Sequence, residues 1–357
     1  MKSFLFRCDF GGAFGWGHLV RCAALARVAR ECGYITGVMT SGDPSVLPSD
    51  IASVFDETIR LDGSCPSLSF WEGLFTQAFS WDVVLIDHYG YVSPRLNPLL
   101  DYLHTRSVCC VQVEDHPKHF SSHADVILCP GFSGEGIDLD VFGSDKVYAG
   151  LDYVLLRPEF GISAEDTFAP RGGGIPRIAV ILGGTDPSLL MPRVLQALYE
   201  ATKGLCIPEI ILPAGADEGS LLEVLSRFSK FRVHEQMSSK AVAQCFKRCD
   251  YGITACGGTV YEMASLGLPF IGVCVAENQE KTARYMEKAW SLPIIQAASF
   301  SQAGFASAWA ALVAQFPEGR RPYASIDARG PYRALSAIVR SIQAQRSRGQ
   351  APAAPQA

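Results

Sequence analysis

The sequence predicts an α/β protein with two doubly wound domains of similar size, each built around an open parallel sheet. Short apolar, β-rich runs alternate along the chain with amphipathic stretches. The alternation stops at a glycine-rich segment near the middle of the chain and then restarts. The length of 357 residues fits two domains, since one domain usually takes roughly 100–200 residues. The 48% of hydrophobic residues is enough to fill two cores.

Four apolar runs in the first half predict buried parallel strands. They cover residues 4–10, 82–88, 107–115 and 124–130. Residues 19–32 keep Ala, Leu and Val at helical spacing, so the first unit is a strand, a glycine-rich loop and a helix. We therefore assign residues 1–160 to an N-terminal Rossmann-like domain.

The second half repeats the pattern, with strands predicted at 178–182, 209–213, 251–254 and 270–275. The region 161–176 contains three consecutive glycines and is predicted to be the linker. We assign residues 177–345 to a C-terminal Rossmann-like domain that includes the last helices of the chain. Residues 346–357 hold too few apolar side chains to pack, so we expect a disordered tail there.

Composition narrows the possible functions and the compartment. The 31 Lys and Arg against 36 Asp and Glu give a net charge of -5, which disfavours binding to long nucleic acids. No apolar run approaches the roughly 18–20 residues that cross a bilayer, and the start does not resemble a signal peptide. We therefore expect a cytoplasmic protein without stable membrane insertion. Its twelve cysteines include no CxxC pair and are expected to be buried free thiols. No feature indicates an oligomeric state.

The first candidate site is the glycine-rich segment 11–21, which follows the first predicted strand. Open parallel sheets bind ligands at the carboxyl ends of their strands, so side chains in such loops are candidates for a site. The loop allows close approach to a ligand, and His18 falls in the first turn of the next helix. The positive helix end disfavours a cation, which favours a neutral imidazole able to act as a base. The alternative is a Rossmann-like loop with an incidental histidine.

A second candidate is the triplet that ends the strand predicted at 82–88. Asp87 could fix the orientation of an imidazole, and His18 is its natural partner. Tyr89 offers a hydroxyl that could reach a substrate. The alternative is that this segment is a structural loop.

These motifs resemble those of a known family. The segment GWGHLVRCAALA, residues 15–26, resembles the GxGHxxRxxxLA signature of the UDP-sugar hydrolases of pseudaminic acid biosynthesis. Further similar segments follow in the same order and extend the resemblance over roughly residues 4–335; they are LIDHYG at 85–90, VEDHP at 113–117, YVLLRPEF at 153–160, LGGTDP at 182–187, ITACGGTVYEMASLGLP at 253–269 and ENQ at 277–279. The resemblance implies a GT-B fold, shared with the lipid II-forming N-acetylglucosaminyltransferase. It also implies release of UDP from UDP-2,4-diacetamido-2,4,6-trideoxy-β-L-altropyranose.

The resemblance and the chemistry of the strand ends together suggest roles for individual residues. His18 is expected to act as general base on a water molecule that attacks the anomeric carbon. Glu262 is expected to hold the ribose hydroxyls; it could instead be an exposed carboxylate favoured by the helix dipole. Asn278 and its neighbour Gln279 offer amides to the sugar, although Asn278 could instead cap a helix. The remaining substrate-binding candidates are Gly17, Arg21, Arg157, Gly183, Gly184, Thr185, Gly257, Gly258 and Thr259. Arg7 is a further cation expected near the cleft.

We expect no metal and no cofactor. His116, His119 and His123 cluster in a loop without acidic residues at fixed offsets, and the DLD triplet at 138–140 is too short to be specific. The resemblance implies a UDP-sugar and water as the partners.

Two other functions remain open at this point. A glycosyltransferase on the same scaffold would use His18 to deprotonate an acceptor hydroxyl. Residues 70–81 are its only candidate lipid-facing helix, and their spacing favours a core helix instead. A non-catalytic nucleotide-sugar-binding protein would bind the ligand without turnover.

Overall fold

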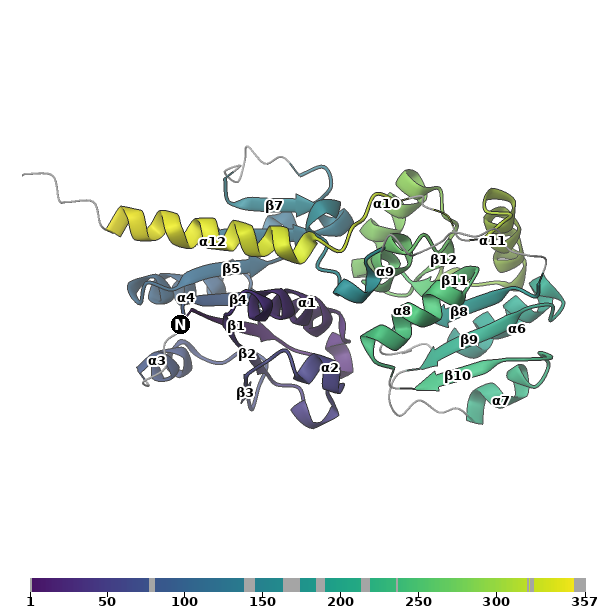
Figure 1. The fold of residues 1–357 in the computed structure, drawn as a ribbon, viewed down its shortest axis with the longest axis horizontal. Coiled ribbons are helices and arrows are strands. Elements are labelled where there is room, and N and C mark those ends of the chain that lie inside the picture. Colours follow the sequence, from purple (N-terminus) through teal and green to yellow (C-terminus); the bar gives the residue numbers. More distant parts are fainter. Residues whose placement is uncertain are drawn as a thin grey trace, which may run out of the picture.

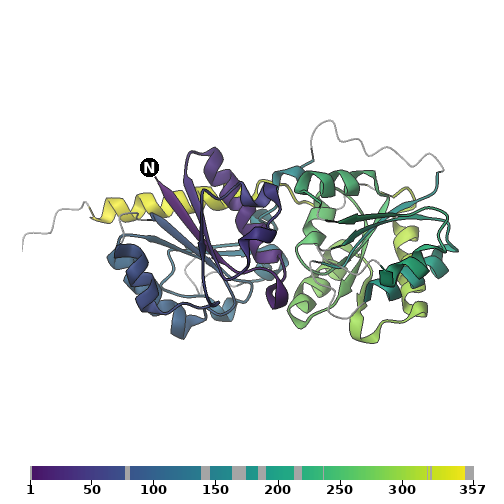
Figure 2. The ribbon, with the colours of Figure 1, turned by 90° about the horizontal axis from the view of Figure 1, so that it is seen from below.

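The protein forms two α/β domains that lie side by side (Figures 1 and 2). The computed structural model describes residues 2–76, 81–137, 145–162, 174–183, 190–212, 219–235, 237–319, 321 and 324–349. Most of the predicted linker and the last eight residues of the predicted tail lie outside this set.

The N-terminal sheet has seven parallel strands in the order β3-β2-β1-β4-β5-β6-β7. Their bounds are β1 Ser3–Cys8, β2 Ile35–Thr40, β3 Glu57–Arg60, β4 Val83–Asp87, β5 Cys109–Val113, β6 Val126–Pro130 and β7 Val147–Gly150. The order of connection reverses between β1 and β4, and a ligand-binding crevice is expected at the carboxyl ends of these two strands.

The C-terminal sheet has six parallel strands in the order β10-β9-β8-β11-β12-β13. Their bounds are β8 Arg177–Ile181, β9 Ile207–Leu212, β10 Arg232–Glu235, β11 Tyr251–Ala255, β12 Phe270–Cys274 and β13 Ile294–Gln296. Here the order reverses between β8 and β11. The two sheets confirm the prediction of two doubly wound parallel domains.

Helices cover both faces of each sheet (Figure 2). Their bounds are α1 Gly17–Glu31, α2 Ser49–Ala52, α3 Leu68–Thr76, α4 Ser93–Thr105, α6 Leu190–Thr202, α7 Gly219–Leu225, α8 Ser239–Arg248, α9 Thr259–Ser265, α10 Glu280–Trp290, α11 Gln302–Gln315 and α12 Gly330–Gly349. None of the helices in the described part of the chain is both long enough and apolar enough to cross a membrane.

Successive side chains of β1 point to opposite faces of the sheet, so the N-terminal core has two layers. Phe4 and Phe6 pack on one face with α1, and Leu5 packs on the other face with α3 and α4. In α3 the side chains of Trp71 and Phe75 are buried, as expected for a core helix, whereas Phe70 is exposed and residues 77–80 of the predicted segment lie outside the described residues. The site-bearing loops therefore stand on a strand buried on both sides.

The last helix packs on a different domain from the one predicted. Four apolar residues of α12 are buried in the N-terminal core against α1 and the sheet: Ala334, Leu335, Ile338 and Ile342. Figure 1 shows α12 running back across this domain. The assignment of all the last helices to the C-terminal domain was wrong, because an apolar face does not indicate which sheet it will cover. The helix also continues to Gly349, so residues 346–349 are not part of a disordered tail.

The cysteines are mostly buried, as expected. Ten of the twelve free thiols are buried, while Cys32 is exposed and Cys65 is half-buried. Burial raises the pKa of the Cys109 thiol to about 12, so this thiol stays protonated at neutral pH. These side chains act as small apolar residues.

The two domains touch through an aromatic contact made by Phe132. Phe132 follows β6 and stacks on Tyr285, with ring centroids 5.8 Å apart. It also packs against Trp290, and its backbone amide donates a hydrogen bond to the Tyr261 hydroxyl at 2.9 Å. A residue of the N-terminal domain is thus part of the C-terminal core.

Replacing Ile338 by Ala should destabilise the N-terminal domain, because the side chain is fully buried between α12 and this core. We expect the free energy of unfolding to fall by about 2–5 kcal/mol. Hydrogen exchange should accelerate in α1 and β1 and remain unchanged in α6. The exposed Gln343→Ala on the same helix is the matched control, and faster exchange confined to the C-terminal domain would contradict this packing.

Candidate active site

The glycine loop after β1 forms a tight turn that presents the start of α1. The Gly11 amide donates to the Gly15 carbonyl at 2.8 Å, and both residues have positive φ, which favours glycine. Helix α1 then begins at Gly17 without a side-chain cap and without an acidic residue in its first turn. The loop therefore leads the chain directly into the helix turn that carries His18.

The structure brings His18 and Asp87 together. Asp87 is the last residue of β4 and is fully buried. The Nδ1 atom of His18 lies 2.5 Å from Oδ1 of Asp87. The neighbouring Trp16 packs on Phe10 at 5.3 Å between ring centroids. This is the contact that the strand-end position of Asp87 suggested.

Arg21 holds the same carboxylate from the next turn of α1. Its Nε donates to Oδ2 of Asp87 and its Nη2 donates to Oδ1, both at 2.6 Å. Its Nη1 donates to both carboxylate oxygens of Asp115 at 3.0 and 3.1 Å. The sequence predicts Arg21 as a substrate ligand, whereas in the structure its donors face two carboxylates. Asp115 was not singled out, although it lies two residues after the end of β5.

The charges around Asp87 keep it ionised. Burial by itself would raise the pKa of Asp87, but the charge of Arg21 and the hydrogen bonds from Arg21 and His18 outweigh it. The pKa of this carboxyl is therefore held well below its usual range. An ionised Asp87 can only accept hydrogen bonds, so the hydrogen of this contact resides on Nδ1 of His18.

The second ring nitrogen of His18 is left to act on a ligand. No described residue hydrogen bonds Nε2, and 7% of the side chain remains exposed. With the hydrogen on Nδ1, a neutral ring carries its lone pair on Nε2. The geometry is that of a base whose tautomer is fixed by a buried carboxylate.

Tyr89 connects this group to the C-terminal domain. Its ring meets the His18 imidazole edge-on, with centroids 4.5 Å apart and planes at 84°. The Asn278 side chain, which follows β12 in the other domain, lies close enough to the Tyr89 hydroxyl to lower its pKa slightly. Loss of hydration and then the charge of Asp115 raise the pKa of Tyr89 to about 12, so its hydroxyl stays protonated. The carboxyl ends of β4 and β12 therefore meet here.

Asn278 does not cap a helix in the structure. The residue before α10 is Gln279, and its side chain forms no capping hydrogen bond. Instead, Oε1 of Gln279 accepts the Val275 amide at 3.0 Å. Of the two amide side chains proposed as sugar ligands, Asn278 is the exposed one, and Gln279 supports the end of the strand.

The glycine turns of the C-terminal domain are described in part. Gly183 follows β8 with a φ of 95°, while Gly184 and Thr185 lie outside the described residues. After β11, the Gly257 amide already donates to the Ala255 carbonyl at 2.8 Å. That N–H is therefore not directed at a ligand. Gly258 borders open space where a side chain would start, and Thr259 begins α9 directly behind it.

Glu262 is buried rather than exposed, with 6% of its surface accessible. Its Oε1 accepts hydrogen bonds from Arg157 Nη2 at 2.6 Å and Nε at 3.2 Å. Arg157 Nη1 donates to the Ser239 hydroxyl at 2.8 Å, and the Ser239 amide donates to Asp50 of the N-terminal domain at 2.7 Å. The predicted residues Arg157 and Glu262 thus form one ion pair. This pair is linked to Asp50 through Ser239, and neither of those two residues was predicted from the sequence.

Arg7 and His88 lie outside this group. Arg7 is fully buried in a pair with Asp9, with Nη1 and Oδ1 2.6 Å apart, so its expected place near the cleft was wrong. The Gly90 amide donates to Nδ1 of His88 at 2.9 Å, and Nε2 of His88 donates to Asp9 at 2.9 Å. Both side chains support the loop that carries Asp87 and Tyr89.

Two sets of side chains in the described residues could offer three metal ligands each. They are His104, Cys110 and Asp125, and Glu209, His234 and Cys245. Neither set includes His18 or Asp87. Of the patterns considered in the sequence, His116 and His119 lie with ring centroids 5.6 Å apart, and residues 138–140 lie outside the described residues.

Comparison with known proteins gives distant relatives. No protein-family model matches the chain. The spore coat polysaccharide biosynthesis protein SpsG of Bacillus subtilis is 23% identical over 280 residues, which are 77% of this chain and 78% of that protein. The UDP-2,4-diacetamido-2,4,6-trideoxy-beta-L-altropyranose hydrolase of Campylobacter jejuni is 24% identical over 289 residues, 80% of this chain and 96% of that protein.

Solved structures resemble the whole chain. The complex of Staphylococcus aureus MnaA with UDP has a TM-score of 0.66 at 12% identity and covers 96% of this chain and 97% of its own. MurG from Acinetobacter baumannii has a TM-score of 0.59 at 13% identity and covers 95% of this chain and 100% of its own. Together with the two parallel sheets, these similarities confirm the predicted GT-B fold.

Replacing Asp87 by Asn should weaken the fold in a pH-dependent way. The change leaves Arg21 without its buried carboxylate, and we expect a loss of about 3–5 kcal/mol in the free energy of unfolding at neutral pH. The native pKa of Asp87 lies below its unfolded value, so its stabilising effect is complete above that value and declines as the pH falls. The difference between the variant and the native protein should therefore shrink at about pH 3.5.

Denaturant unfolding at both pH values measures this difference. Asp62→Asn, at an exposed position of the same domain, is the control and should change stability little at either pH. A difference for Asp87→Asn that stays constant or grows on acidification would contradict the ionised carboxylate.

Proposed function

We propose that this protein hydrolyses a UDP-linked 2,4-diacetamido-2,4,6-trideoxy sugar, or a close relative of it, by attack of water on the anomeric carbon. The observation that carries the proposal is the His18–Asp87 pair at the start of α1. The name of the Campylobacter jejuni relative supports the substrate, and the GT-B fold supports a nucleotide-sugar ligand.

The proposed reaction needs one base and a leaving group. Nε2 of His18 takes a proton from water while the water oxygen forms a bond to the anomeric carbon. The bond between this carbon and the β-phosphate oxygen breaks, and UDP leaves with the electron pair. Direct displacement inverts the anomeric configuration. The hydrogen on Nδ1 stays with His18, and the resulting imidazolium is stabilised by the Asp87 carboxylate.

Arg21 and Asp115 act in this proposal as positioning residues. Arg21 fixes both oxygens of Asp87, which fixes the plane of the carboxylate that meets His18. Asp115 balances the charge of Arg21. Gly17 allows the ligand to approach the start of α1. Tyr89 is neutral, so its hydroxyl can bind a sugar oxygen next to His18.

The C-terminal domain is proposed to hold UDP. Glu262 uses only Oε1 towards Arg157, which leaves Oε2 as an acceptor for the ribose hydroxyls. The amides of Gly258 and Thr259 can bind the diphosphate, with Gly183, Gly184 and Thr185 expected on its other side. Asn278 stands between the two halves of the substrate because it already reaches Tyr89.

An NMR time course with the UDP-sugar and no acceptor tests the proposal. We expect one free sugar and one UDP for each substrate consumed, with the inverted anomer formed first. Release that requires an added alcohol or lipid acceptor would favour a glycosyltransferase. Binding without any release would favour a non-catalytic nucleotide-sugar-binding protein.

Replacing His18 by Asn should lower kcat by roughly 10²–10⁴-fold, because general-base assistance typically contributes that much. Binding of UDP, measured by calorimetry, should stay nearly unchanged since the base does not face the nucleotide. His123→Asn changes a more exposed histidine of the same domain and should keep full activity. Full activity in His18→Asn would remove this residue from the mechanism.

Replacing Glu262 by Gln should weaken UDP binding by roughly tenfold or more, because a charged acceptor for two hydroxyls is lost. The exposed Glu287→Gln in α10 is the matched control. Measuring UDP affinity directly separates this effect from the chemical step. An unchanged affinity would show that the ribose does not lie on Glu262.

A further inference from the structure

A cavity lined by cationic side chains lies on the C-terminal domain, away from the candidate active site. A cavity of about 350 Å³ is lined by Arg177, Ile207, Ser229, Lys230, Phe231 and Arg232. Arg177, Ile207 and Arg232 are the first residues of β8, β9 and β10, so the cavity lies at the amino end of the sheet. The six residue steps from Arg177 to Gly183 at the opposite end span about 20 Å.

The cavity borders a buried carboxylate that the proposed mechanism does not use. Glu209 has no accessible surface. Its Oε1 accepts Arg177 Nη1 at 2.6 Å, and its Oε2 meets His234 Nε2 and Arg248 Nη2, each at 2.8 Å. Burial by itself would raise the pKa of Glu209, but the hydrogen bonds from Arg248 and His234 and the charges around them lower it to about 2. Both oxygens of Glu209 therefore already accept hydrogen bonds, and its charge does not require Lys230 or Arg232 as a partner.

Cations exceed carboxylates around the cavity. Arg232 Nη1 approaches Glu209 only to 3.6 Å, and 53% of the Arg232 side chain is exposed. No residue in the described ranges forms an ion pair with Lys230, which lines the same cavity. Four side-chain cations, Arg177, Lys230, Arg232 and Arg248, thus face two carboxylates, Glu209 and Asp250, the second of which accepts the Arg177 amide.

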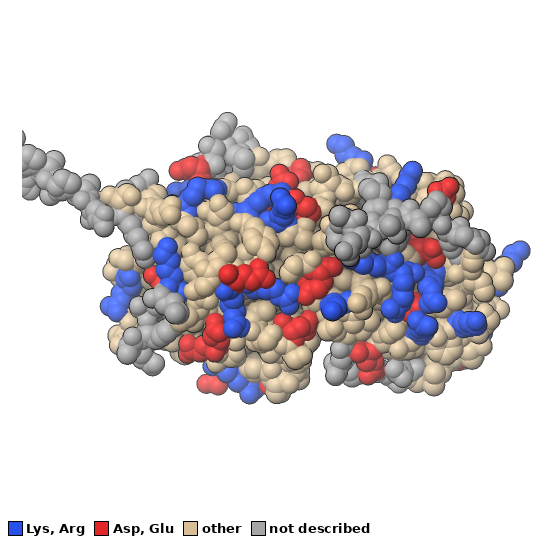
Figure 3. All heavy atoms as spheres, viewed as in Figure 1, with Lys and Arg blue, Asp and Glu red and all other residues tan. Residues whose placement is uncertain are grey.

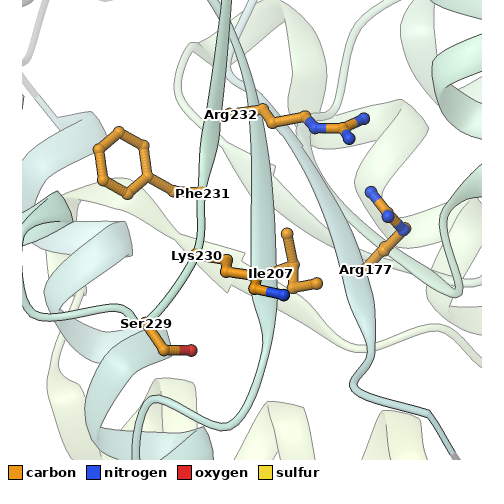
Figure 4. Close-up of a pocket in the computed structure, with 6 residues that line it drawn as sticks. All are labelled: Arg177, Ile207, Ser229, Lys230, Phe231 and Arg232. Atoms are coloured by element: carbon orange, nitrogen blue, oxygen red, sulfur yellow. The ribbon is translucent and has the colours of Figure 1, made fainter.

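The arginine side chains that line the cavity extend in a common direction, which suits the binding of an anion. Figure 4 shows Arg177 and Arg232 extending towards the same side of the strands, while Phe231 points the other way. On one face of this domain Lys and Arg gather more densely than Asp and Glu (Figure 3). Because its hydrogen bond to Glu209 fixes Arg177 in place, a ligand would not have to order that side chain.

A metal ion is the competing occupant, and the charges disfavour it. Glu209, His234 and Cys245 place three ligand atoms within 4.8 Å of one another. However, three arginines surround the same carboxylate, and its oxygens already accept hydrogen bonds from two of them. A divalent cation would have to displace these guanidinium groups against their repulsion.

We propose that this cavity binds a small phosphorylated metabolite through its phosphoryl oxygens. Guanidinium groups bind phosphate through paired N–H donors, and Lys230 adds a mobile positive charge. A cavity with converging cations suits a compact multivalent anion better than an extended polymer. The site is separate from the proposed UDP site, and it does not depend on the proposed reaction.

Calorimetric titration of the full chain with inorganic tripolyphosphate, with and without UDP, tests the proposal. We expect one tripolyphosphate per chain in both conditions. The double variant Lys230→Ala/Arg232→Ala should bind at least roughly tenfold more weakly, since each lost charged contact is worth about one such factor. Glu209 keeps its three closest partners in this variant, so the fold should be retained.

The matched control Arg227→Ala/Lys288→Ala removes the same charge from positions outside the cavity and should bind normally. Equal weakening in the control would overturn the proposal, because binding would then follow net charge alone. Loss of tripolyphosphate binding on adding UDP would place the anion in the nucleotide site and would also overturn it. So would stoichiometric binding of Zn²⁺ or of single-stranded RNA in place of the small anion.

Discussion

The candidate active site depends on one buried carboxylate. Asp87 ends a central strand, has no contact with solvent, and receives both His18 and Arg21 from the first two turns of α1. Removing a carboxylate from water is costly unless its charge is compensated, so this position fixes the side chains around it. Consequently, Nδ1 of the His18 imidazole is hydrogen bonded to Asp87, and Nε2 is available to a ligand.

The two domains share one topological feature, which places the polar residues of each domain at one edge of its sheet. Each sheet reverses its order of connection beside its first strand, and the loops at that edge carry the polar residues. Tyr89 and Asn278 join these edges at the proposed sugar, and Asp50, Ser239 and Arg157 join them at Glu262. Glu262, the carboxylate proposed to bind the nucleotide, is thus held by contacts from both domains. UDP binding is therefore linked to the relative position of the domains.

Much of this arrangement could be predicted from the sequence. The eight strands predicted from apolar runs are all present, Asp87 ends β4, and His18 lies in the first turn of the helix that follows β1. Five strands were missed for local reasons. In β2, Gly37 interrupts the apolar run because the ring of Trp81 occupies the space of a side chain there. The strands β3 and β10 lie at sheet edges and are too polar to stand out.

Contacts between distant side chains were harder to predict. Nothing local distinguishes Asp115 or Ser239 from other polar residues after a strand or at a helix start, and their roles depend on Arg21 and Arg157 reaching them. Arg7 was misplaced because a cation next to a glycine loop suggests a ligand, while its partner Asp9 is only two residues away. The face covered by α12 depends on tertiary packing alone.

The protonation of His18 tests the account most directly. Nitrogen-15 NMR of the free protein at neutral pH, with the His18 ring assigned by comparison with a variant that lacks it, distinguishes the two ring nitrogens. The account predicts a hydrogen on Nδ1, which faces Asp87, and an unprotonated Nε2. A hydrogen on Nε2, in either a neutral or a charged ring, would contradict it.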